Sequence, residues 1–97
     1  MTIYDKARWQ IDGGKDADVV TAHFQFIFGW LNQNNLLSEY GKEALKTGID
    51  ATAVLTDEMV NVGGNSFLEK HYDEYISKID YGINENEDLL REMYFKL

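Results

Sequence analysis

The sequence predicts a mainly α-helical fold, a compact bundle of four or five helices with an extended N-terminal arm. Three observations predict it. Apolar residues recur at helical spacing in most segments, residues that favour helix caps precede those segments, and 97 residues without an internal repeat suffice for one core. An α+β fold, with a small two-stranded sheet made of residues 3–11 and 50–62, is the alternative. We expect residues 1–97 to form a single domain.

The opening stretch, YDKARWQIDGG, predicts an extended arm that is anchored by Trp9 on the central helix. Apolar and polar side chains alternate, as in a strand with one buried face, and the apolar positions are Ile3, Ala7, Trp9 and Ile11. Asp5 breaks this alternation. Because a strand cannot stand alone, a strand here would need residues 50–62 or a second copy of the chain as its partner.

The double glycine after the arm predicts a turn rather than a ligand loop. A phosphate-binding loop has Ser or Thr after its Gly-Lys pair, but Asp16 follows Lys15 here. A calcium loop of the EF-hand type that began at Asp12 would need glutamate at its twelfth position, where His23 stands. We therefore expect Gly13-Gly14 to form a turn, and Asp16 or Asp18 to cap the next helix.

Residues 18–33 predict the central helix. A strand is compatible with the alternating aromatic residues, but it would leave Ile27 and Leu31 facing water. On a helix the apolar residues, with one histidine, fall within one arc of about 200°. They are Val19, Val20, His23, Phe24, Phe26, Ile27, Phe28, Trp30 and Leu31. Since His23 lies inside this arc, we expect a buried imidazole that is bonded to a carbonyl or a tyrosine.

The next two segments differ in how clearly they predict a structure. Ser38 predicts the start of a short helix over residues 39–47, and Gly48 predicts its end. Residues 50–62 have apolar side chains at helical spacing, but their β-branched residues suit a strand equally. We interpret residues 50–62 as a helix and keep the strand as the alternative.

The last third of the chain predicts two amphipathic helices. Asn65 is expected to cap the first, whose apolar stripe consists of Leu68, Tyr72, Tyr75, Ile76 and Ile79. The second opens with Asn84-Glu85-Asn86-Glu87, an approximate capping box. One face of that helix then carries Leu89, Leu90, Met93, Tyr94 and Leu97. Phe95 alone points the other way.

Composition and charge exclude several classes of function. Seventeen acids against nine bases give a net charge of −8, and without clustered lysines and arginines we expect no nucleic-acid partner. The absence of cysteine excludes disulfides, thiolate metal sites and cysteine nucleophiles. No secretory signal and no apolar stretch of about 20 residues occur, so we expect a cytoplasmic protein that does not bind membranes.

Candidate catalytic residues are few, and we expect a protein that is not an enzyme and holds no cofactor or metal. His71 is the main candidate, because Glu74 could pair with it at a spacing of three residues, with Asp73 nearby. No HExxH pattern supports zinc. A small metal- or metabolite-binding enzyme that uses His71 and these carboxylates is the alternative function.

Aromatic residues among acids predict a partner-binding surface in the C-terminal third. Its candidate residues are Tyr72, Asp73, Tyr75, Tyr81 and Phe95. Tyrosines supply contact area and a polar group at interfaces, and the surrounding acids favour a basic protein partner. The alternative is that the tyrosines border the core and Phe95 frays at the chain end. A homodimer that uses the arm or Phe95 is a further possibility.

Several short runs carry a resemblance. They are Tyr4-Asp5-Lys6 with Trp9 and Gly13-Gly14, Leu36-Leu37-Ser38, Gly48-Ile49-Asp50, and Phe67-Leu68-Glu69-Lys70 with Tyr72-Asp73. Together they cover most of the chain, which resembles a small uncharacterised bacterial domain family of unknown function. The resemblance assigns no catalytic residues. By analogy with other small acidic bacterial proteins, it implies an immunity-like protein that binds and inhibits a toxin.

Overall fold

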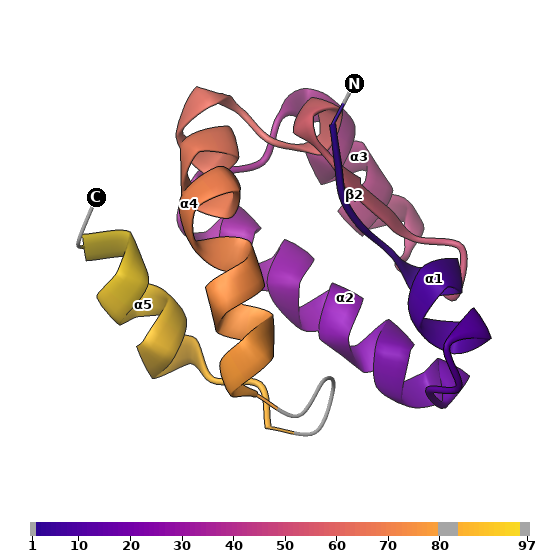
Figure 1. The fold of residues 1–97 in the computed structure, drawn as a ribbon. Helices are drawn as coiled ribbons and strands as arrows, with labels where there is room; N and C mark the ends of the chain where they lie inside the picture. The colour runs from indigo at the N-terminus through magenta and orange to yellow at the C-terminus, as the bar shows by residue number, and fades with distance from the viewer. Residues whose placement is uncertain (1, 80–83, 96–97) are drawn as a thin grey trace.

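The computed structural model of the chain describes residues 2–79 and 84–95 (Figure 1). Within those residues there are five α-helices, a short 3-10 helix and a two-stranded sheet. In chain order they are β1 (Ile3–Lys6), α1 (Ala7–Asp12), α2 (Ala17–Gln33), α3 (Glu39–Thr47), β2 (Val54–Thr56), η1 (Asp57–Met59), α4 (Val62–Lys78) and α5 (Glu87–Phe95). The mainly α-helical prediction is confirmed, and the small sheet of the alternative is present as well.

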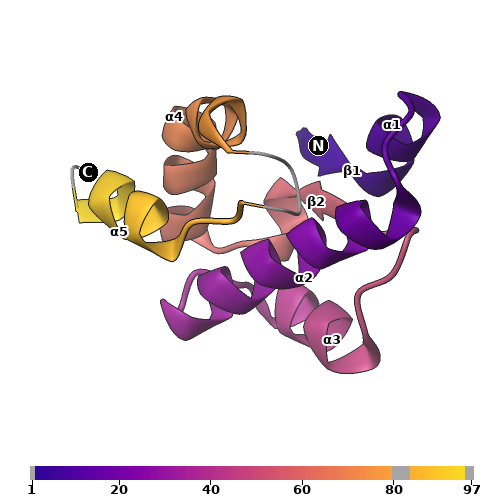
Figure 2. The ribbon, with the colours of Figure 1, turned by 90° about the horizontal axis from the view of Figure 1, so that it is seen from below.

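Helix α2 is the central element, as the sequence predicts. Figure 2 shows it crossing the middle of the molecule, with α3 on one side of it and α4 and α5 on the other. The Asp16 carboxylate caps it by accepting from the amides of Asp18 and Val19, at 2.9 and 3.3 Å. Its buried residues are Val20, His23, Phe24, Ile27, Phe28, Trp30 and Leu31.

The N-terminal arm differs from the prediction, because only residues 3–6 are extended. The next six residues form α1, in which Ala7 and Ile11 are four residues apart and share the face that packs on the core. Trp9 lies between them in sequence and therefore points away, with 53% of its surface exposed. The expectation that Trp9 anchors the arm on the central helix was wrong. Gly13-Gly14 does form the predicted turn, with Gly14 at a φ of +105°.

Residues 50–62 correct a second prediction. Residues 54–56 form β2, which pairs antiparallel with β1 in the register Ile3↔Thr56, Asp5↔Leu55 and Lys6↔Val54. A single bridge then joins Val60 to Leu37. The helix interpretation was wrong. Strand β1 and Leu37 supply backbone partners to this β-branched segment, and β-branched residues favour such pairing. The helical spacing of its apolar residues offers no comparable stabilisation.

Helix starts and ends follow the predicted caps in most places. The Ser38 hydroxyl accepts from the amide of Gly41 at 3.1 Å, and Gly48, with a φ of +119°, ends α3. Helix α4 begins earlier than expected, because Asn61 rather than Asn65 caps it by accepting from the Gly64 amide.

Helix α5 closes the core at the side of α4. Trp30 of α2 packs on Phe67 of α4, with ring centroids 5.0 Å apart, and Tyr94 of α5 meets both rings edge-on at 5.9 and 6.0 Å. The Asn86 side chain accepts from the Leu89 amide at 3.0 Å and caps α5. No helix in the described part of the chain has the length and apolar character needed to cross a membrane.

Two helical glycines give opposite predictions for substitution by alanine. A Cβ at Gly41 would lie 2.0 Å from the Met59 carbonyl oxygen, whereas a Cβ at Gly29 would meet nothing within 4 Å. We expect Gly41→Ala to lower the free energy of unfolding by about 1–3 kcal/mol through overpacking. Gly29→Ala should raise it by about 0.5–1 kcal/mol. Urea denaturation measures both, and equal effects of the two substitutions would contradict the packing of α3 on η1.

Candidate functional site

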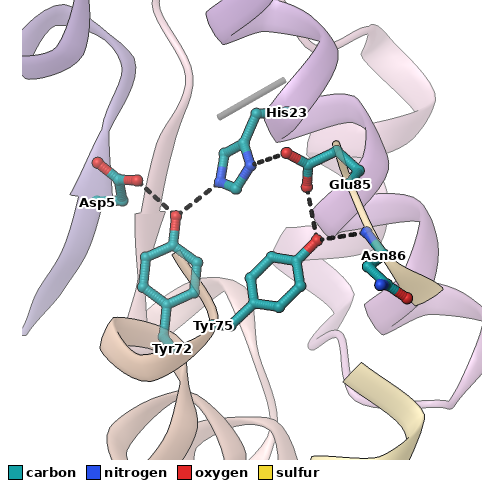
Figure 3. Close-up of polar contacts among 6 residues, drawn as sticks. All are labelled: Asp5, His23, Tyr72, Tyr75, Glu85 and Asn86. Atoms are coloured by element: carbon teal, nitrogen blue, oxygen red, sulfur yellow. Dashed lines mark hydrogen bonds and ion pairs between the residues drawn. The ribbon is translucent and has the colours of Figure 1, made fainter. Parts of the chain in front are cut away.

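A chain of hydrogen-bonded side chains crosses the interior from β1 to the start of α5 (Figure 3). The Tyr72 hydroxyl lies 2.5 Å from Oδ2 of Asp5 and 2.9 Å from Nε2 of His23. Nδ1 of His23 lies 2.8 Å from Oε2 of Glu85. The Tyr75 hydroxyl donates to Oε1 of Glu85 at 2.8 Å and accepts from the backbone amide of Asn86 at 3.0 Å. We call this set, Asp5, His23, Tyr72, Tyr75, Glu85 and Asn86, the polar network.

Local structure explains how each side chain reaches the network. Tyr72 and Tyr75 are three residues apart and so share the buried face of α4. A register shift in the β1–β2 pairing between Ile3 and Asp5 accompanies the inward placement of Asp5. The other oxygen of Asp5 accepts from the Lys6 amide at 2.8 Å, which holds the carboxyl in place.

The contacts from Asp5 to Glu85 place two carboxyl groups on one chain of donors and acceptors. The Tyr72 hydroxyl donates to Asp5, and the two ring nitrogens of His23 lie against the Tyr72 hydroxyl and Glu85. Each contact joins polar groups that would be costly to leave unpaired in the interior.

Burial makes the centre of the polar network a structural connection rather than a contact site for ligands, whereas Glu85 is half-buried and Asn86 is exposed. His23 and Tyr75 are 0% exposed, and Asp5 and Tyr72 are 2% exposed. Side chains so enclosed do not touch a molecule in solution in this conformation. Burial also raises the pKa of Tyr75, a change that the Glu85 carboxylate reinforces and the hydrogen bond from Asn86 opposes. What the network does is tie β1, α2, α4 and the start of α5 together.

The structure divides the predicted partner-binding residues. Tyr72 and Tyr75 are buried in the polar network, so neither side chain lies at the surface of the described residues. Asp73 is exposed on α4, and Phe95 at the end of α5 is 79% exposed. Tyr81 lies outside the described residues. The expected tyrosine partner of His23 is confirmed.

The residues of the alternative enzyme function do not form a site together. The His71 ring lies 5.5 Å from that of Phe67, and its Nδ1 is buried without a hydrogen-bond partner in the described residues. Glu74 forms an ion pair with Lys78 at 3.0 Å instead. Among residues 2–79 and 84–95, no three His, Asp or Glu side chains are placed to hold a metal ion.

Two network members escaped sequence analysis. Asp5 had one signal, since it interrupts the alternation of the arm, and a buried polar partner explains that interruption. Glu85 had no signal, because it precedes its helix and belongs to no apolar stripe. Its contact with His23 spans 62 residues, a separation that local patterns do not record.

Two hollows on the surface of the described residues could hold a ligand group. The first, of about 250 Å³, lies between α2 and α5 and is lined by Gln25, Phe26, Gly29, Trp30, Gln33 and Glu87. The second, of about 490 Å³, lies over the sheet and is lined by Ile3, Lys6, Tyr40, Thr52, Ala53, Val54, Thr56, Glu58 and Met59. We call the first the α2–α5 hollow.

Comparison of the chain with protein-family models, with curated proteins and with solved structures gave no match. The resemblance to an uncharacterised bacterial domain family therefore stays a prediction.

Substitutions of Asp5 test whether the polar network needs a hydrogen-bonding side chain at this position. Asparagine can accept from the Lys6 amide and can still form a hydrogen bond with the Tyr72 hydroxyl. We expect Asp5→Asn to change the free energy of unfolding by less than about 1 kcal/mol. Asp5→Leu should lower it by about 1–3 kcal/mol, because it removes a hydrogen-bonding partner from buried polar groups. Equal losses in both variants, in urea denaturation, would contradict the hydrogen-bonding role of Asp5.

The raised pKa of Tyr75 predicts a loss of stability at high pH. Below the ordinary tyrosine pKa of about 10, the hydroxyl is neutral in both the folded and unfolded states, and its contribution to stability is complete. Above pH 10 the unfolded state loses the proton first, so the free energy of unfolding falls by up to about 1.4 kcal/mol per pH unit. Tyr75→Phe should show a shallower decline, and Tyr40→Phe, at an exposed position, should follow the native protein. Superimposable curves for Tyr75→Phe and the native protein would exclude this role.

Proposed function

We propose that this chain is a non-enzymatic protein-binding module, and that it binds a basic protein through the exposed side of α5 and the neighbouring part of α4. An immunity-like inhibitor of a toxin is the form of this function that we favour. The observation that carries the proposal is Phe95, a large apolar side chain left 79% exposed beside acidic residues.

The exposed side of α5 has the composition of an interface. Asp88, Glu92 and Phe95 follow one another at spacings of four and three residues, so they lie along one side of the helix. The Phe95 ring stacks on that of Tyr94, with centroids 5.8 Å apart, which restricts its orientation. An aromatic side chain surrounded by polar groups is the usual arrangement at the centre of a protein interface. A partner that covers Phe95 would remove its apolar surface from water.

Charge favours a basic partner. In the described parts of α4 and α5, six exposed carboxylates stand against three exposed cations. The carboxylates are Glu69, Asp73, Glu74, Glu87, Asp88 and Glu92, and the cations are Lys70, Lys78 and Arg91. Such an excess speeds association with a positively charged protein and repels acidic ones. Salt should weaken the association, because it screens these charges.

The polar network supports this function by holding α5 in place. Glu85 contacts His23 of α2, and the Asn86 amide donates to Tyr75 of α4 at 3.0 Å. These contacts position the residues directly before α5. A surface that is ordered before binding loses less conformational entropy on association.

The proposal places this chain in a bacterial cytoplasm, next to the toxin that it neutralises. Its acidic character and its resemblance to an uncharacterised bacterial family both support that placement. A toxin gene beside the gene for this chain would supply the partner to test.

Binding can be tested with two synthetic peptides of equal length, one basic and one acidic, each containing the same apolar residues. We expect the basic peptide to bind in low salt and to bind more weakly in high salt, as measured by fluorescence anisotropy. Phe95→Ala should weaken binding by about five- to tenfold, the loss typical of a central aromatic contact. Trp9→Ala is the matched control, because Trp9 is another exposed aromatic residue but lies on α1.

Three outcomes would overturn the proposal. They are equal binding of both peptides, the same affinity for Phe95→Ala as for Trp9→Ala, and no binding of either the basic peptide or a neighbouring toxin. A concentration-dependent mass that Phe95→Ala reduces to that of a monomer would replace the basic partner with a second copy of this chain.

A further inference from the structure

We propose that the α2–α5 hollow is the subsite for an arginine side chain of the basic partner. This inference rests on the proposed function and adds to it the kind of residue that the partner must present.

The α2–α5 hollow has the size and the openness to accept one side chain. Its volume is about 250 Å³, and it lies between residues of α2 and Glu87 of α5. Gly29 forms part of its lining, and a Cβ at that position would meet no atom within 4 Å. A glycine therefore leaves open a space that a larger residue on this turn of α2 would occupy.

The lining is apolar on one side and accepts hydrogen bonds on the other. Phe26 and Trp30 supply carbon surface, and Glu87 supplies a carboxylate. Gln25 uses its amide nitrogen to donate to the Ile49 carbonyl at 3.4 Å, which leaves its amide oxygen as the group able to accept. A ligand for this hollow needs an apolar part and several donors.

Arginine has that combination of groups. Its methylene stem packs on apolar surface while its guanidinium stays close to water, and the guanidinium presents donors in a fixed plane. A carboxylate can accept two of these donors side by side, and a glutamine oxygen can accept another. Lysine carries its charge on a compact ammonium group and cannot form the planar paired contact.

Glu87 already binds a guanidinium weakly and has capacity for another. Its Oε1 lies 3.4 Å from Nη2 of Arg91, one turn further along α5, and both side chains are 54% exposed. Exposed pairs of this spacing contribute little to stability, so Arg91 can yield to an incoming group. Asp88, the next residue in the first turn of α5, lies outside the hollow, and its carboxylate contacts the Arg91 guanidinium at 3.6 Å. Glu87 rather than Asp88 lines the hollow.

The inference can be tested by NMR titration of the full chain with N-acetyl-arginine N-methylamide. The citrulline counterpart, which has nearly the same shape and no charge, is the control ligand. We expect saturable shifts of the Trp30 indole N–H and of the Gln25 and Gln33 side-chain amides with arginine and not with citrulline. Glu87→Gln should weaken binding by about three- to tenfold. Glu43→Gln, at an exposed position of α3 outside the lining of the hollow, should leave it unchanged.

Blocking the space gives a second test that does not depend on charge. Gly29→Leu should fill the hollow and abolish the shifts, and unchanged thermal unfolding would show that this variant still folds. Equal shifts with citrulline, equal effects of Glu87→Gln and Glu43→Gln, or no saturable shift at all would each overturn the subsite.

The two proposals fail in different ways. If the arginine compound does not bind but the basic peptide still binds through Phe95, the subsite is wrong and the protein-binding function stands. If the arginine compound binds as described but neither the peptide nor a neighbouring toxin binds, the hollow is a site for small guanidinium compounds. The proposed binding of a basic protein is then wrong.

Discussion

The rest of the structure depends on the polar network that crosses its interior. Asp5 and Glu85 bring two carboxyl groups into contact with one chain of hydrogen bonds through Tyr72 and His23. These contacts give polar groups of the interior their partners, in a medium where an unpaired polar group is costly.

The polar network also fixes the position of the surface that we propose to be functional. The network joins β1 at one end of the sequence to the residues before α5 at the other, with α2 and α4 between them (Figure 3). Helix α5 is short, and it is also held by the contacts of Tyr94 with Trp30 and Phe67 and by its buried residues Leu90 and Met93. Interior polar contacts and an apolar face together therefore fix where the acidic side of α5 lies.

Local patterns predicted the parts of this fold whose causes are local. Helix α2 was predictable because one wide apolar arc and its capping aspartate lie within the same segment, and α3 was predictable from Ser38 and Gly48. Residues 50–62 were misread because their pairing with β1 involves residues about fifty positions away. The prediction for Trp9 was wrong because residues 7–12 form a helix rather than a strand. Side chains two residues apart share a face in a strand but not in a helix, so Trp9 does not share the buried face of Ala7 and Ile11. The site was harder still, since Glu85 becomes part of it only through a distant histidine.

Native-state hydrogen exchange of two amides tests the role of the polar network most directly. The Lys6 amide donates to the Asp5 side chain, and the Asn86 amide donates to the Tyr75 hydroxyl, so network side chains protect both. If the network joins the two ends of the chain, both amides should exchange only with the global unfolding that exposes the centre of α2. Exchange of either amide through a separate opening of much lower free energy would show that the ends are held independently, and would contradict the account.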